Sequence, residues 1–121
     1  MIAEQWTIQI AAEENILALA GDLAVGPDNI YSMFNNADLK FPTIRDVEGN
    51  TIQITHGNFI HLLNSSDRGF RHEAFTALYD TYKKFGNMIS TTFVSHLKQE
   101  AFFARVRIHM QKQQKYLFHI P

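Results

Sequence analysis

The sequence predicts a mainly α-helical fold with one β-hairpin, a helical lobe built around one very long amphipathic helix. Apolar residues recur in steps of three and four over residues 66–110, which is the spacing of one helix face. No proline interrupts that stretch. The only convincing β pattern lies within residues 38–55. We therefore expect a single helical domain over residues 1–121.

The predicted long helix is too long for the globule that the chain can form. At about 1.5 Å per residue, forty-odd helical residues span roughly 60 Å. A compact domain of 121 residues should be only roughly 35 Å across. Either the helix breaks, or the chain is one piece of something larger. The apolar stripe consists of Phe70, Ala74, Leu78, Tyr82, Phe85, Ile89, Phe93, Leu97, Ala101, Ala104 and Ile108.

The helix boundaries follow from capping residues and weak helix formers. Thr55 is a candidate N-cap for a short helix that runs to Asn64, and Asp67 should cap the long helix. Gly86-Asn87 is the weak point of the long helix. Because the stripe keeps its phase across this point, we expect the helix to continue through it and to end near Met110, where a polar run begins.

The N-terminal part reads as two shorter helices. Residues 1–10 fit either a short strand or the frayed start of a helix. The pattern then becomes helical, and Gly21 or Gly26 can end the helix. Pro27 suits the first position of a short second helix, which should end at Asn35-Asn36.

The hairpin is predicted from its turn. Residues 39–45 and 51–55 flank Asp46-Val47-Glu48-Gly49-Asn50, and Gly49 suits a left-handed position after a type I turn. Pro42 lacks an N–H, so its strand should be an edge or begin late. A lone hairpin is marginal in water, so we expect a helix, or a missing partner, against its apolar face. The residues predicted to share that face are Ile44, Ile52 and Ile54.

Composition excludes several classes of function. The chain has no cysteine, which excludes disulfides and thiolate metal sites and is compatible with a reducing compartment. A formal net charge of −1 leaves no electrostatic case for nucleic acid or an anionic membrane. No signal-peptide pattern and no apolar run of about 20 residues is visible. We expect a soluble cytoplasmic protein without nucleic-acid or membrane partners.

The sequence contains no recognisable reactive centre. His72-Glu73 begins a near miss of the zinc-peptidase signature H-E-x-x-H, but Thr76 stands where the second histidine should be. His56 and His61 are five residues apart, so on a helix they diverge by about 140°. No cysteine nucleophile, G-x-S-x-G elbow or phosphate loop occurs. We predict no catalytic, cofactor-binding or metal-binding residues. The remaining histidines, His96, His109 and His119, are scattered singly.

Several strings of the sequence nevertheless match a known pattern. They are Asn35–Ile44, Ile54–Gly57, Asp67-Arg68, Glu73–Tyr82, Phe102–Arg107 and the ending Ile120-Pro121. Together they resemble the oligoendopeptidase F family of zinc peptidases. The resemblance covers most of the chain from about Ile30 onwards, and residues 1–10 match poorly.

The resemblance implies a particular part of a longer enzyme. Family members are several times this length, and their H-E-x-x-H helix lies in a later catalytic domain. The matching region is a non-catalytic N-terminal helical lobe that forms part of the wall of the substrate channel. None of the family's zinc ligands or catalytic residues maps onto this chain. We therefore expect no enzyme activity and no cofactor in this chain alone, with zinc and the cleavage of short peptides belonging to the parent. The poor match of residues 1–10 and the break after Pro121 lead us to expect a truncated reading frame or an excised fragment.

Two other hypotheses stay open. One is a stand-alone helical interaction module that self-associates, because a lobe without its neighbour leaves apolar surface that water disfavours. A two-fold pairing through the long helix would cover it, so the expected partner is a second copy or the missing catalytic domain. The other is a histidine-based metal binder.

Overall fold

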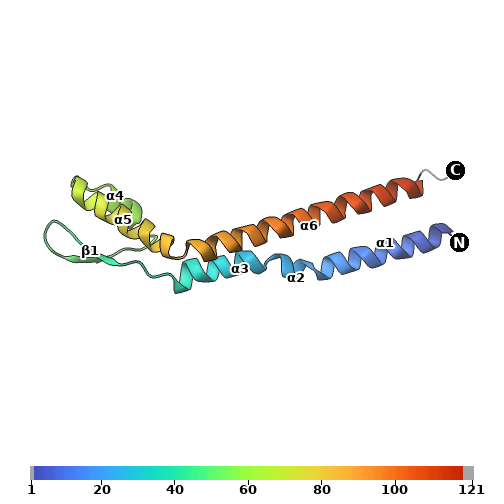
Figure 1. Cartoon of the computed structure of the whole chain (residues 1–121), viewed down its shortest axis with the longest axis horizontal. Coiled ribbons are helices and arrows are strands. Elements are labelled where there is room, and N and C mark those ends of the chain that lie inside the picture. Colours follow the sequence, from blue (N-terminus) through green and yellow to red (C-terminus); the bar gives the residue numbers. More distant parts are fainter. Residues whose placement is uncertain (1, 119–121) are drawn as a thin grey trace. The chain divides into compact units, whose positions relative to one another are not determined.

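The computed structural model describes residues 2–118, with the backbone alone at residues 2, 3, 6, 117 and 118. The described chain is mainly helical with one two-stranded antiparallel sheet (Figure 1), which confirms the predicted fold class. Its longest element is a C-terminal helix of 33 residues. The elements are α1 Ile2–Leu19, α2 Gly21–Ala24, α3 Gly26–Met33, the π-helix η1 Phe34–Asp38, β1 Thr43–Arg45, β2 Thr51–Gln53, α4 Phe59–Leu63, α5 Arg68–Lys84 and α6 Gly86–Phe118.

The chain forms two compact units. Unit 1 comprises Met1–Ser32 and Thr91–Pro121, and unit 2 comprises Met33–Ser90. Helix α6 begins in unit 2 and continues into unit 1. The single domain over residues 1–121 stays a prediction.

The hairpin of unit 2 has the predicted turn but shorter strands. Ile44 pairs with Ile52 across β1 and β2, as expected. Gly49 has a φ of +85°, the left-handed conformation that the turn requires. The regular ladder begins only after Pro42, because proline has no N–H to donate. Beyond the ladder, the Ile54 N–H donates to the Pro42 carbonyl at 3.4 Å.

Helix α5 covers the apolar face of this hairpin, as predicted. It contacts β1 and packs against α4. Ile54 and Ala74 lie at the centre of the resulting core, with 1% and 0% of their surface exposed. Unit 2 therefore has a core of its own. Its buried members are Phe34, Leu39, Phe41, Ile44, Ile54, Leu62, Ala74 and Leu78.

Helix α4 begins later than predicted. Thr55 and Asn58 bond to each other reciprocally: the Asn58 N–H donates to Thr55 Oγ1 at 3.2 Å, and the Thr55 N–H donates to Asn58 Oδ1 at 2.9 Å. This closed turn occupies residues 55–58, so the helix starts at Phe59. Thr55 therefore makes the bonds of the predicted cap, and its carbonyl also accepts from the Phe59 N–H at 3.1 Å, but the regular helix begins only at Phe59.

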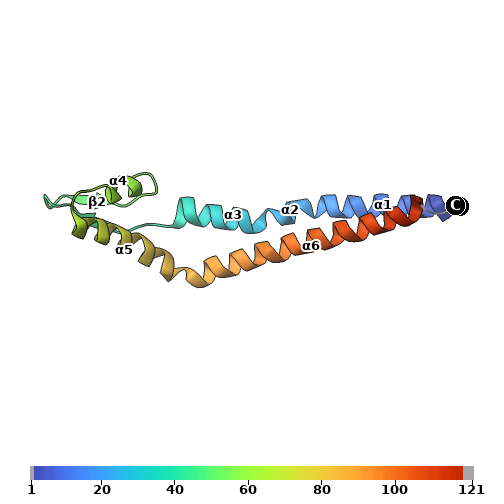
Figure 2. The same cartoon turned by 90° about the horizontal axis from the view of Figure 1, so that it is seen from above.

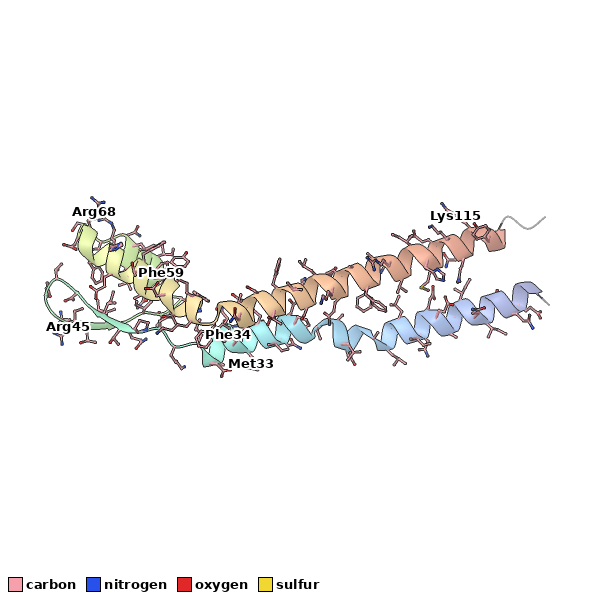
Figure 3. The ribbon with its side chains drawn as sticks, viewed as in Figure 1. Met33, Phe34, Arg45, Phe59, Arg68 and Lys115 are labelled. Atoms are coloured by element: carbon pink, nitrogen blue, oxygen red, sulfur yellow. The ribbon has the colours of Figure 1, made fainter. Side chains whose placement is uncertain are left out.

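The predicted single helix over residues 66–110 is wrong, because the structure contains two helices there. Asp67 caps α5, as expected, and accepts from the Phe70 N–H at 2.6 Å. Helix α5 ends at Lys84, and Phe85 leaves helical geometry with φ −106° and ψ 15°. The Phe85 ring packs edge-on against Phe34 with centroids 5.0 Å apart (Phe34 is labelled in Figure 3).

This break has a local and a non-local cause. Gly86 is a poor helix former, which lowers the cost of interrupting the helix beside it. Phe34, which Phe85 contacts, lies far from Phe85 in the sequence. The spacing of apolar residues along the helix therefore gives no sign of this contact. Beyond the break, α6 runs through the polar residues 111–115 to Phe118 instead of ending near Met110.

The N-terminal helices also differ from the prediction. Residues 2–10 are helical and belong to α1, which resolves the ambiguity between strand and helix. Gly21 and Gly26 stand at the predicted C′ positions, two residues after the ends of α1 and α2, and each also begins the next helix. Both glycines keep negative φ, so neither adopts the left-handed conformation of a glycine C-cap. The expected exit at Asn35-Asn36 is the π-helix η1.

A polar cluster joins η1 to α5 within unit 2. The Tyr82 hydroxyl donates to Asn35 Oδ1 at 2.7 Å, across 47 residues of sequence. His56 Nε2 lies 3.3 Å from the Asn35 carbonyl oxygen. The Phe41 ring packs edge-on against both His56 and Tyr82, with centroids 5.0 and 5.6 Å away. The cluster fixes the π-helix against the core.

Replacing Tyr82 with phenylalanine should therefore destabilise the protein. Tyr82→Phe leaves Asn35 Oδ1 without its donor, and we expect the free energy of unfolding in urea to fall by about 1 kcal/mol. Tyr79→Phe is the matched control, since it removes a hydroxyl one turn away on the same helix from a side chain that is 44% exposed. An equal loss in both variants would contradict this role of the Tyr82 hydroxyl.

The hairpin turn should have a measurable titration. The Asn50 side chain donates to Asp46 Oδ2 at 3.1 Å, and the backbone N–H groups of Asn50 and Glu48 donate to Asp46 Oδ1 at 2.8 and 3.0 Å. These bonds, the Asn50 side-chain bond first, hold the pKa of Asp46 below its ordinary value of 3.8. Because the folded-state pKa is lowered, the turn is stabilised above pH 3.8 and loses that stabilisation as the pH falls through the folded value.

We expect Asn50→Ala to raise the pKa of Asp46 toward 3.8, as measured by the carboxyl carbon shift in an NMR titration. Asn15→Ala, which removes an exposed asparagine on α1, should leave that pKa unchanged. An Asp46 pKa that does not respond to Asn50→Ala would show that the side-chain bond from Asn50 to Asp46 does not form in solution.

Candidate functional site

Unit 1 has a groove between α6 and the helices α1 and α2. In both views α6 runs antiparallel to α1 within this unit (Figures 1 and 2). The groove has a volume of about 660 Å³. Its apolar lining is Leu17, Ala18, Ala24, Phe103, Ala104 and Met110. Glu14, Glu100 and Arg107 add charge to the same lining, so the groove can accept an apolar surface with polar edges.

Two polar contacts tie α6 to α2 and α3. Gln99 Nε2 donates to the Leu23 carbonyl at 2.8 Å, near the end of α2, where carbonyls lack helical partners. His96 Nδ1 lies 3.8 Å from Asp28 Oδ1, a contact that becomes an ion pair when the histidine is protonated. Both contacts lie towards the break between α2 and α3.

The helices of unit 1 expose most of their large apolar side chains. Among its described side chains, only Pro27 and Met110 are buried. Leu23 on α2 and Phe93 on α6 are 72% and 61% exposed. A surface of this kind is typical of an interaction site. Its members are Ile8, Ile16, Leu19, Leu23, Val25, Ile30, Tyr31, Phe93, Val94, Leu97, Phe102, Ile108 and Tyr116.

The histidines do not come together. His72 is exposed on α5, and Thr76 follows it one turn later, so the near miss of H-E-x-x-H lies on a solvated face. His56 belongs to the polar cluster of unit 2, and His61 is exposed on α4. Within residues 2–118, no group of three histidine, aspartate or glutamate side chains is arranged to hold a metal ion. Of the others, His96 faces Asp28, His109 lies 3.0 Å from the side chain of Gln113, and His119 is outside the described residues.

Sequence reasoning missed the two arrangements that the structure makes most prominent. The hydrogen bond between Tyr82 and Asn35 cannot be recognised from the spacing of residues in the sequence, although both residues lie in strings that carry the family resemblance. The groove was missed because its walls come from both ends of the chain. A signal was available, since both ends carry more apolar residues than one helix face can bury.

In the part of the chain that the structure describes, none of the helices is both long and apolar enough to cross a bilayer.

Known proteins resemble this chain over most of its length. It is 45% identical over 95 residues to oligopeptidase PepF of Bacillus subtilis, which covers 78% of this chain and 14% of that protein. It is 36% identical over 105 residues to group B oligopeptidase PepB of Streptococcus agalactiae, covering 87% of this chain and 18% of that protein. The plasmid-encoded oligoendopeptidase F of Lactococcus lactis is 32% identical over 114 residues, which cover 94% of this chain and 19% of that protein. No family model matches the chain.

A solved structure supports the same relationship. The crystal structure of oligoendopeptidase-F from Enterococcus faecium matches 92% of this chain and 22% of its own, with a TM-score of 0.78 and 37% identity. The chain thus spans less than a fifth of the length of the three curated relatives. By sequence and by fold, the chain belongs to the oligoendopeptidase F family and corresponds to one segment of its much longer members.

Proposed function

We propose that the chain is a non-catalytic helical lobe of an oligoendopeptidase F-type peptidase and does not hydrolyse peptides by itself. The observation that carries the proposal is the match of 92% of the chain to one part of a solved oligoendopeptidase-F, in a sequence without H-E-x-x-H. Zinc peptidases of this kind take two ligands from that helix motif and use its glutamate as the general base. The chemistry therefore belongs to a region outside this match.

In the parent enzyme the lobe would form part of the wall of the substrate channel. Confinement by such a wall admits short peptides and excludes folded proteins by size. The core of unit 2 suits this role, because a wall must keep its shape while substrates pass. In this proposal the zinc ion sits in the catalytic domain of the full-length enzyme, and the cysteine-free chain resides in the cytoplasm.

A second candidate function is a stand-alone interaction module. The exposed apolar side chains of unit 1 favour it, since they need a cover whether or not a catalytic domain is present. The two candidate functions differ in which polypeptide covers the exposed apolar side chains of unit 1: the catalytic domain of the parent enzyme or a separate partner.

The purified chain should not cleave a fluorogenic oligopeptide, with or without added zinc. If the near miss at His72-Glu73 were active, Glu73→Gln would abolish turnover, so this variant serves as the internal control. The Bacillus subtilis relative assayed in parallel provides the positive signal. Turnover by the chain that a chelator removes and that Glu73→Gln abolishes would overturn the proposal.

A chimera tests the lobe directly. We expect the Bacillus subtilis relative to keep its peptidase activity when its matched segment is replaced by the corresponding 95 residues of this chain. The same chimera carrying Ile54→Asp should lose both its fold and its activity, because Ile54 is only 1% exposed in the core. A chimera that folds, by circular dichroism and elution volume, yet is inactive would contradict a role as an equivalent lobe.

A further inference from the structure

The charges of unit 1 are segregated between its two arms. We call residues 2–32, which comprise α1, α2 and most of α3, the acidic arm, and residues 91–118 of α6 the basic arm. The acidic arm carries five carboxylates and no lysine or arginine. The basic arm carries five lysines and arginines and one carboxylate. The net charge of −1 for the whole chain conceals this division.

These charges lie at the surface beside the exposed apolar residues. Glu14 on the acidic arm and Arg107 on the basic arm are both exposed and both line the groove. Ile16 and Ile108, close to them in sequence, are 67% and 53% exposed. Each arm therefore exposes both apolar side chains and charges, and the charges of each arm are mainly of one sign. The exposed charged residues of the arms include Glu4, Glu14, Asp22, Lys98, Arg105, Arg107 and Lys112.

We propose that a second copy of this chain docks on unit 1 through a two-fold interface, with the acidic arm of each copy against the basic arm of the other. A two-fold interface uses the same surface on both subunits, so that surface must be complementary to itself. Two arms of opposite charge on one chain meet this requirement. Burial of the exposed apolar side chains supplies the affinity, and the charges set the register.

The charge pattern favours a second copy over other occupants. A nucleic acid needs an extended basic surface, and here the acidic arm lies beside the basic one and repels phosphate. Two copies of a chain with a net charge of −1 repel each other little. The inference does not depend on the peptidase-family role, since it uses only the charges and exposures of unit 1.

Charge reversal tests the pairing. One variant, E4K/E14K/D22K, makes the acidic arm basic, and another, K98E/R105E/R107E, makes the basic arm acidic. In each variant alone, like charges face each other across the interface. We expect the dissociation constant from sedimentation equilibrium to rise about tenfold or more in each. The wild-type dimer should also weaken with added salt, because salt screens exposed charges.

Mixing the two variants should restore association. In the mixed pair, each basic arm again faces an acidic arm, so a heterodimer should form with a dissociation constant close to that of the wild type. The control variant K40E/R45E/K84E lowers the net charge by six, as K98E/R105E/R107E does, but within unit 2, and it should dimerise like the wild type. Circular dichroism of each variant alone shows whether it is folded before mixing.

Three results would overturn the inference. The first is a wild-type chain that stays monomeric at every concentration. This result counts against the inference even if the monomer binds an RNA. The second is dimerisation of both reversed variants at wild-type strength, which would leave the charges without a role. The third is folded variants that remain monomeric when mixed, which would show that the arms attract each other only within one chain. None of these results bears on the chimera, so the lobe proposal succeeds or fails separately.

Discussion

Burial of apolar side chains is the constraint on which the rest of this structure depends, and the two units meet it differently. Unit 2 closes a hairpin under α5, so that Ile54 and Ala74 lose almost all contact with solvent. Unit 1 has nearly the same amount of chain but buries only Pro27 and Met110 among its described side chains. Unit 2 covers its own apolar side chains, whereas unit 1 leaves most of its described large apolar side chains exposed.

The parts of the fold that the sequence predicts well are those determined by neighbouring residues. The turn at Gly49, the late start of β1 after Pro42 and the cap at Asp67 depend on contacts within a few positions, and all three occur. The break at Phe85 was missed because the apolar stripe stays in phase across it, while the ring that Phe85 meets belongs to Phe34. Periodicity records which face of a helix is apolar and carries no information on where that helix ends.

The candidate site divides in the same way. Reactive motifs have fixed local spacing, so a near miss such as Thr76 can be recognised from the sequence alone. The bond from Tyr82 to Asn35 spans 47 residues, and only the fold brings them together. The separation of acidic and basic residues between the two arms of unit 1 is visible in the sequence, but the net charge of the whole chain does not reveal it. Charge counted over each predicted helix would have shown it.

The two proposals place different occupants on one surface, and this makes them exclusive for any single molecule. In a family member the remaining four-fifths of the polypeptide is linked covalently to this segment. If that part covers unit 1, as the lobe proposal implies, its effective concentration there is high and a second copy cannot compete. Where no other part of a polypeptide covers unit 1, the dimer proposal gives its apolar surface and segregated charges to a second copy. The same surface can therefore serve as an internal lobe contact in a long polypeptide and as a dimer interface in a short one.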